Sequence, residues 1–143
     1  MTREISNSED VMDSRDVMER LDELEMERQD LVDAVQSAGE AEDFESSKVS
    51  LELWDDDHGD ELKTLKSLAE EGENLTREWR DGATLIRESY WVEYVEDLCK
   101  DIGDMPREIP HYIVIDWEST ADNIAVDYST LDFDGVTYYI RSC

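Results

Sequence analysis

The chain has 143 residues, of which 40 are Asp or Glu and 13 are Lys or Arg, so its formal net charge is −27. This charge excludes a conventional nucleic-acid-binding surface and disfavours an anionic membrane as a partner. Two cysteines and the lack of any apolar run near the ~18 residues of a membrane span predict a cytoplasmic protein without a disulfide framework.

The two halves of the chain differ in composition. Residues 1–72 hold 24 acidic and 7 basic residues, whereas three of the four tryptophans and all six tyrosines lie after residue 73. Aromatic rings need a core, while a strongly acidic segment needs solvent. We therefore predict an acidic helical arm over residues 1–72 and a compact α+β domain over residues 73–143. The expected fold class is α+β and mostly helical.

A seven-residue repeat of apolar residues predicts a long helix over about residues 9–38. Ser8 is its expected N-cap and Gly39 its expected stop. A single helix cannot bury the narrow seam that this repeat creates, so the helix is expected to be coiled-coil-like and to pair. The predicted dimer seam consists of Val17, Leu21, Leu24, Arg28, Leu31 and Val35.

Two partners fit this seam. One is a second copy of the chain in a parallel homodimer, in which Arg20 at a g position faces Glu25 at an e position. The other is a helix predicted over about residues 60–71, which would fold back as a hairpin. Residues 39–59 mix apolar and acidic side chains, and we expect irregular or broken helix there.

The second half predicts a small domain of helices packed on a β-hairpin. Apolar residues at helical spacing indicate helices over about residues 88–102 and 116–127. Asp134 and Gly135 form the preferred two-residue hairpin turn, flanked by β-branched and aromatic residues. Because a two-stranded hairpin is marginal alone, the helices must cover it.

The candidate chemical motifs fail on spacing. Aligning Gly59 with the sixth position of an EF-hand loop puts Trp54 and Leu65 at liganding positions, and the two histidines have no cysteine at ligand spacing. The sequence contains no phosphate-cradling loop and no nucleophile elbow. We therefore expect no metal, no cofactor and no enzymatic activity.

Acidic residues are unusually dense on the first predicted helix. Eleven lie between Glu9 and Asp33, or about one carboxylate per 3.4 Å of helix, which matches the phosphate spacing along one strand of duplex DNA. Ordinary coiled coils interleave both signs, so this excess indicates a use for the electrostatic field. The alternatives are a solvated coiled-coil face and adaptation to high salt. The carboxylates predicted to mimic phosphates are Asp10, Asp13, Asp16, Glu19, Asp22, Glu23, Glu27, Asp30, Asp33, Asp55, Asp56 and Asp57.

Several strings in the second half resemble small acidic phage and prophage proteins. They are WRDGATLIRESYW at 79–91, YVEDL at 94–98, DIG at 101–103, IDWESTA at 115–121, DY at 127–128 and FDGVTYY at 133–139. These proteins are described as antirestriction proteins, distantly similar to the ArdA type. The resemblance covers about residues 60–143.

The resemblance implies an elongated, acidic, dimeric mimic of duplex DNA that occupies the DNA groove of a restriction–modification enzyme. This chain is shorter, corresponds to one α/β module and adds the heptad helix, and no single functional residue carries over. The expected function is thus a phage-type anti-defence inhibitor, antirestriction or anti-CRISPR, in the host bacterial cytoplasm. Its expected partners are the basic DNA-binding surface of a host restriction or CRISPR protein and a second copy of the chain in a homodimer. The alternative is a coiled-coil dimeric structural or adaptor protein without a nuclease target.

Overall fold

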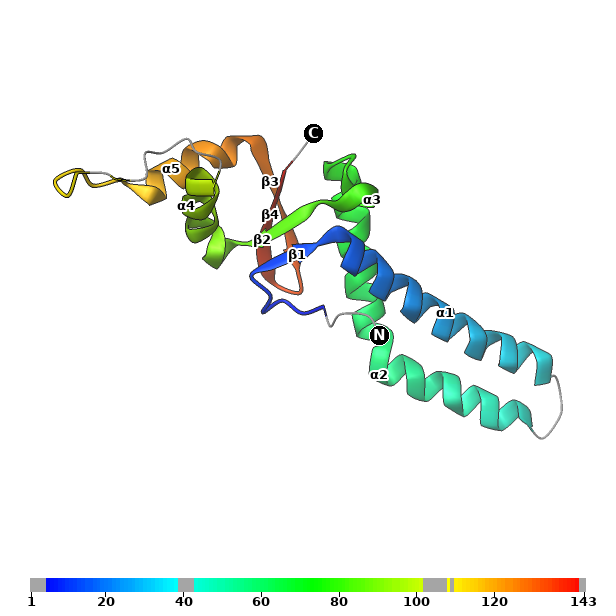
Figure 1. Ribbon diagram of the computed structural model, residues 1–143. Helices are drawn as coiled ribbons and strands as arrows, with labels where there is room; N and C mark the ends of the chain where they lie inside the picture. The colour runs from blue at the N-terminus through cyan, green and yellow to red at the C-terminus, as the bar shows by residue number, and fades with distance from the viewer. Residues whose placement is uncertain (1–4, 39–42, 102–107, 109, 142–143) are drawn as a thin grey trace.

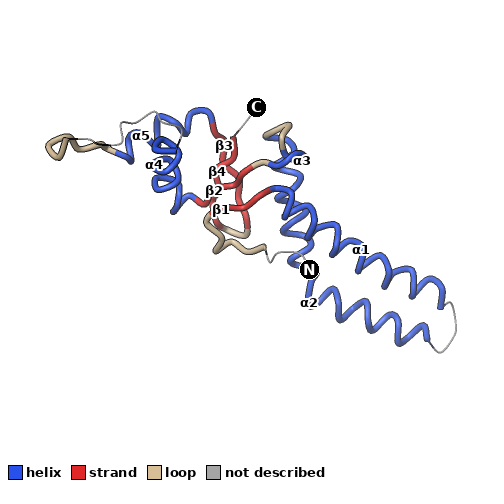
Figure 2. The backbone as a smooth tube through the Cα atoms, in the orientation of Figure 1, coloured by secondary structure: helices blue, strands red, loops and turns tan. Residues whose placement is uncertain are grey.

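The computed structural model describes residues 5–38, 43–101, 108 and 110–141. A small sheet lies between a long helical hairpin on one side and two shorter helices on the other (Figures 1 and 2). This arrangement is α+β and mostly helical, as predicted. In chain order the elements are β1 (Val11–Asp13), α1 (Ser14–Ala38), α2 (Asp43–Leu75), α3 (Trp79–Gly82), β2 (Thr84–Arg87), η1 (Glu88–Tyr90), α4 (Trp91–Asp101), α5 (Trp117–Ile124), η2 (Ala125–Asp127), β3 (Tyr128–Phe133) and β4 (Val136–Arg141).

The sheet has four antiparallel strands in the order β1-β2-β4-β3. The predicted hairpin is confirmed, because β3 pairs with β4 and the turn residues Asp134 and Gly135 have φ angles of 51° and 83°. Positive φ at both central residues characterises the type I′ turn that Asp-Gly favours. The two short strands β1 and β2 extend the sheet beyond β4 and were not predicted.

Different helices bury the two faces of the sheet. On β2, Leu85 packs into a core with α1, α2 and α3, whereas the next residue, Ile86, packs with α4 and α5. Tyr138 and Tyr139 divide between the same two cores on β4. This division follows from the alternation of side chains along a strand. Trp91 lies in the second core, with its ring stacked on Tyr139 at 4.5 Å between centroids.

One core joins the two predicted units. The cluster on the hairpin side of the sheet combines Met12 and Val17 from the predicted arm with Trp79 and Leu85 from the predicted domain. The predicted boundary between residues 72 and 73 also falls inside α2. The first half therefore completes the sheet and core of the second half.

The start of α1 differs from the prediction. The helix begins at Ser14, so Ser8 is not its N-cap, and the three preceding residues form β1 because Met12 fills the core. The carboxylate of Asp13 accepts a hydrogen bond from the backbone N–H of Arg15 at 2.8 Å. Asp13 therefore caps the helix.

Ser14 fastens the start of α1 to α3. Its buried hydroxyl donates to the carbonyl of Trp79 at 2.6 Å and accepts from the N–H of Ala83 at 2.7 Å. Its backbone N–H also donates to the carbonyl of Ala83 at 2.8 Å. The base of the hairpin is thus hydrogen-bonded to the segment that leads into β2.

The second helix is longer than predicted. α2 is continuous from Asp43, so the expectation of irregular structure over residues 39–59 is wrong for the described part of that segment. Gly39, the predicted stop of the first helix, lies outside the described residues. The buried and half-buried positions of α2 include a seven-residue repeat at Phe44, Leu51, His58, Leu65 and Gly72. His58 and Gly72 contribute little apolar signal, which hides this repeat in the sequence.

The long helix pairs with α2 of the same chain, which is the second of the two predicted partners. Val17 and Leu24 are fully buried in the shared core and Leu21 packs against it. Arg28 binds Asp55 of α2. These four residues, predicted as part of a dimer seam, therefore face the hairpin interior. The other two seam residues, Leu31 and Val35, are half-buried.

Arg20 also binds within the chain. In the parallel-dimer alternative it would face Glu25 of a second copy, but it contacts Glu61 on α2 at 2.6 Å and Glu23 at 2.5 Å. Fold-back places Glu61 beside it, and hydrogen bonding to Glu61 raises the pKa of Arg20.

The two helices predicted in the second half are confirmed as α4, preceded by η1, and α5, followed by η2. The Asp116 carboxylate accepts a hydrogen bond from the N–H of Ser119 at 3.1 Å, which caps α5 and lowers the pKa of Asp116. The indole N–H of Trp91 donates to the carbonyl of Ala121 at 3.2 Å. This bond joins α4 to α5 above the sheet.

Candidate functional site

Three of the carboxylates predicted to mimic phosphates form ion pairs within the chain. The pairs are Asp13 with Arg15, Glu23 with Arg20 and Asp55 with Arg28, at N–O distances of 2.8, 2.5 and 2.9 Å. Hydrogen bonding to Arg15 lowers the pKa of the Asp13 carboxyl. Each of these three carboxylates binds an arginine of the same chain, which reduces the negative charge that it presents to solvent.

Three other predicted carboxylates lie apart from any outward row. Glu27 accepts a hydrogen bond from the indole N–H of Trp54 at 3.3 Å. Asp16 is half-buried. Asp10 lies beside the sheet, where its backbone carbonyl accepts from the N–H of Arg87 at 2.8 Å.

Four carboxylates form a row on the outer face of α1, and we call Glu19, Asp22, Asp30 and Asp33 the outer row. All four are exposed. At 3.6 residues per turn they lie within about 80° of one another and opposite the hairpin seam, and they span about 21 Å along the helix. Asp33 accepts a hydrogen bond from the neutral Gln29 at 2.9 Å, which leaves its charge uncompensated.

The remaining two predicted carboxylates, Asp56 and Asp57, are exposed on α2. The predicted density of one carboxylate per about 3.4 Å therefore describes the whole helix and not one face. On the outer row, two pairs of charges are separated by a gap of about 12 Å between Asp22 and Asp30. The row is thus sparser than the phosphates of one DNA strand.

Met26 fills this gap and was not among the predicted residues. Its side chain is 68% exposed. Asp22 and Asp30 are each four residues from it, and Glu19 and Asp33 are each seven residues from it. With the buried seam as reference, Met26 occupies the outward f position of its heptad. An apolar residue at an f position is the sequence signal that identifies it.

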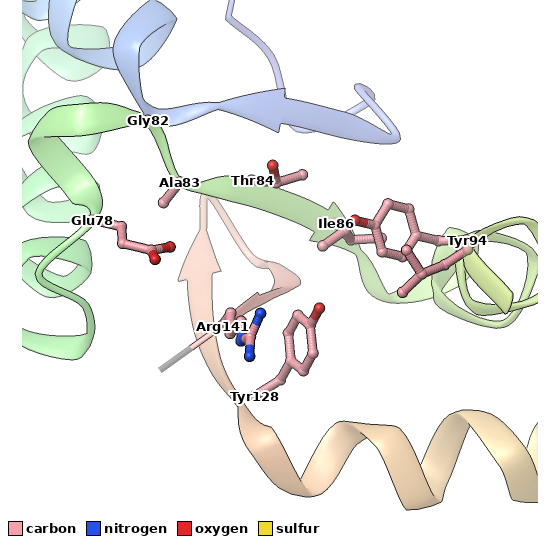
Figure 3. A pocket seen from close by; sticks show the side chains of 9 residues that line it. Glu78, Gly82, Ala83, Thr84, Ile86, Tyr94, Tyr128 and Arg141 are labelled. Atoms are coloured by element: carbon pink, nitrogen blue, oxygen red, sulfur yellow. The ribbon is translucent and has the colours of Figure 1, made fainter. Parts of the chain in front are cut away.

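A separate cavity of about 270 Å³ lies at the junction of α3, β2, β3, β4 and α4. Figure 3 shows Glu78 on one side of it and Arg141 and Tyr128 on the other. Burial raises the pKa of the Tyr128 phenol. The described lining residues include no histidine, cysteine or lysine. The cleft is lined by both polar and apolar side chains.

Within the described residues, no group of three or more His, Cys, Asp and Glu side chains is arranged to hold a metal ion. None of the helices in the described ranges combines the length and apolar character needed to cross a membrane. Comparisons of the chain with protein-family models, with curated proteins and with solved structures find no match.

Proposed function

We propose that this protein is a phage-type anti-defence inhibitor, antirestriction or anti-CRISPR, that acts as an acidic mimic of DNA. The outer row of α1 would occupy the basic DNA-binding groove of a host defence nuclease or effector. In this proposal the sheet and its two cores are scaffold, and the protein is not an enzyme.

The outer row is the observation that carries the proposal. Its four carboxylates are exposed and lie opposite the hairpin seam. The arginines at the inner side of the hairpin, Arg20 and Arg28, bind other carboxylates. The row therefore keeps its negative charge on a helix that is held by a second helix.

The net charge of −27 supports a basic partner. Such a field attracts a positively charged groove over long range and speeds association, and salt weakens this attraction. The same field repels DNA, anionic membranes and further copies of the chain. Charge complementarity thus favours a basic protein surface.

The test is competition with DNA. The protein is mixed with a restriction enzyme or a CRISPR effector and its DNA substrate, and cleavage is followed between about 50 mM and about 200 mM salt. We expect inhibition that weakens steeply as salt rises. A structural or adaptor protein would give no inhibition at any salt concentration, and that result would refute the proposal.

A charge-matched pair of variants separates the outer row from net charge alone. One variant carries Glu19→Gln, Asp22→Asn, Asp30→Asn and Asp33→Asn. The control neutralises the same number of exposed carboxylates on α4 and α5: Glu93→Gln, Asp97→Asn, Asp101→Asn and Glu118→Gln. We expect the first variant to lose inhibition and the control to retain it. Equal loss in both would show that the row has no special role.

A further inference from the structure

An exposed methionine lies at the centre of the outer row. The four carboxylates are arranged symmetrically about Met26, at four and seven residues on either side. These separations correspond to about one and two helical turns, so all five side chains lie on one face. The face therefore consists of an apolar centre between two acidic pairs.

Charge decides what can cover this face. A second copy of the chain would bring its own acidic surface against the row, and a nucleic acid or an anionic membrane would be repelled in the same way. A basic protein surface is attracted to both acidic pairs. Methionine is unbranched and polarisable, and it adapts to apolar recesses of irregular shape.

We infer that Met26 anchors the interface with this basic partner, which presents an apolar recess between two basic patches about 12 Å apart. The inference rests on the proposed function and adds that Met26 determines which basic surface the protein binds. Duplex DNA offers phosphates but no thioether, so the methionine lets the protein bind a DNA-binding groove by a contact that DNA does not make. The acidic pairs govern association, and Met26 governs dissociation.

The test compares Met26→Ala with Met26→Leu and Leu53→Ala. Leu53 is a matched control, because it is 58% exposed on α2 of the same hairpin. Binding to the restriction enzyme or CRISPR effector that the wild type inhibits is measured by surface plasmon resonance at several salt concentrations. We expect Met26→Ala to raise Kd about tenfold through faster dissociation, as for an interface hot spot. Its slope of log Kd against log salt should be unchanged, whereas Met26→Leu and Leu53→Ala should bind nearly as the wild type does.

Poly-lysine is the second probe, because it is basic and offers no apolar recess. Met26→Ala should bind it like the wild type, and neutralisation of the outer row should weaken that binding. If Met26→Ala binds the effector as tightly as the wild type while the row variant does not, the anchor is refuted and the proposed function stands. If the wild type binds neither a restriction enzyme nor a CRISPR effector, the Met26 anchor and the proposed function are both refuted. Circular dichroism confirms that each variant remains helical.

Discussion

The two ends of the helical hairpin are built differently. At its base, Val17, Leu24, Leu65 and Leu68 are buried in the core that also covers the sheet. Toward its tip, none of the described residues after Leu24 on α1 or before Leu65 on α2 is fully buried. A half-buried seam holds the tip, with Arg28 bound to Asp55 across it. The hairpin of α1 and α2 extends away from the sheet (Figure 1).

This difference separates stability from recognition. The base joins both predicted units and supplies much of the buried apolar area, whereas Met26 and the second acidic pair, Asp30 and Asp33, lie beyond the last fully buried residue of α1. Substitutions near the tip should therefore alter binding with little effect on folding. Matched substitutions at the base and near the tip test the comparison directly.

The largest expected effect is truncation of the base. Leu65 is 1% exposed, so Leu65→Ala should lower the free energy of unfolding by about 3 kcal/mol through lost burial and a residual cavity. Leu51→Ala, at the equivalent heptad position nearer the tip, removes a half-buried side chain and should cost less than half as much. Urea denaturation followed by circular dichroism measures both. Equal losses would mean that the tip is packed as tightly as the base.

The two glycines of α2 should respond in opposite directions. A Cβ at Gly72 would overlap Cε3 of the buried Trp79 ring, so Gly72→Ala should destabilise the fold by about 1–2 kcal/mol. A Cβ at Gly59 meets nothing closer than 3.9 Å, so Gly59→Ala should stabilise by about 0.5–1 kcal/mol through helix propensity. Thermal unfolding of the two variants gives the signs. A stabilising Gly72→Ala would show that Trp79 can move.

Asp13 gives a pH-dependent test at the base. Asp13→Ala should cost about 1 kcal/mol at neutral pH by removing the cap of α1. Asp13→Asn keeps a cap and should lose only the contribution of Arg15. The pKa of Asp13 is lowered in the folded protein, so this contribution is present above the ordinary pKa of about 3.9 and disappears as the pH falls through the lowered value. The stability difference between wild type and Asp13→Asn, measured by urea titration at several pH values, should vanish in acid. A difference that grows as the pH falls would contradict a lowered pKa of Asp13 in the folded protein.

The smallest expected effect is at the ion pair near the tip. The Arg28 and Asp55 side chains are 41% and 40% exposed, so Arg28→Gln should cost only about 0.5 kcal/mol, and salt should reduce that cost. Arg20, at 20% exposure, lies nearer the base and binds two carboxylates, so Arg20→Gln should cost more, about 1 kcal/mol. Denaturation at low and high salt distinguishes them. A larger cost at Arg28 would reverse the comparison of base and tip.

Local patterns predicted much of the fold. The Asp134–Gly135 turn, both helices of the second half and the inner face of α1 each leave a signal within a few turns of chain. β1 and β2 leave no such local signal, because strands of three and four residues are defined by their pairing and not by their own sequence. The first part of α2 was missed because His58 contributes little apolar signal to the seven-residue repeat of that helix.

The candidate surface was predictable only in part, because local sequence patterns show the faces of a helix but not its long-range contacts. Heptad phase correctly placed the outer row on the exposed side of its helix. It could not reveal that Asp55 meets Arg28, since that pair depends on fold-back over 27 residues. The function assigned to the row stays a prediction that the competition assay tests.

The pairing of β1 with β2 sets the order in which the chain can fold. Met12 and Leu85, partners across these strands, are 73 residues apart along the chain. Closing so long a loop is entropically costly and slow, whereas the α1–α2 hairpin forms from neighbouring segments. During synthesis the acidic hairpin can assemble early, but β1 has no partner strand until β2 has emerged from the ribosome, and the sheet is complete only after β3 and β4 follow.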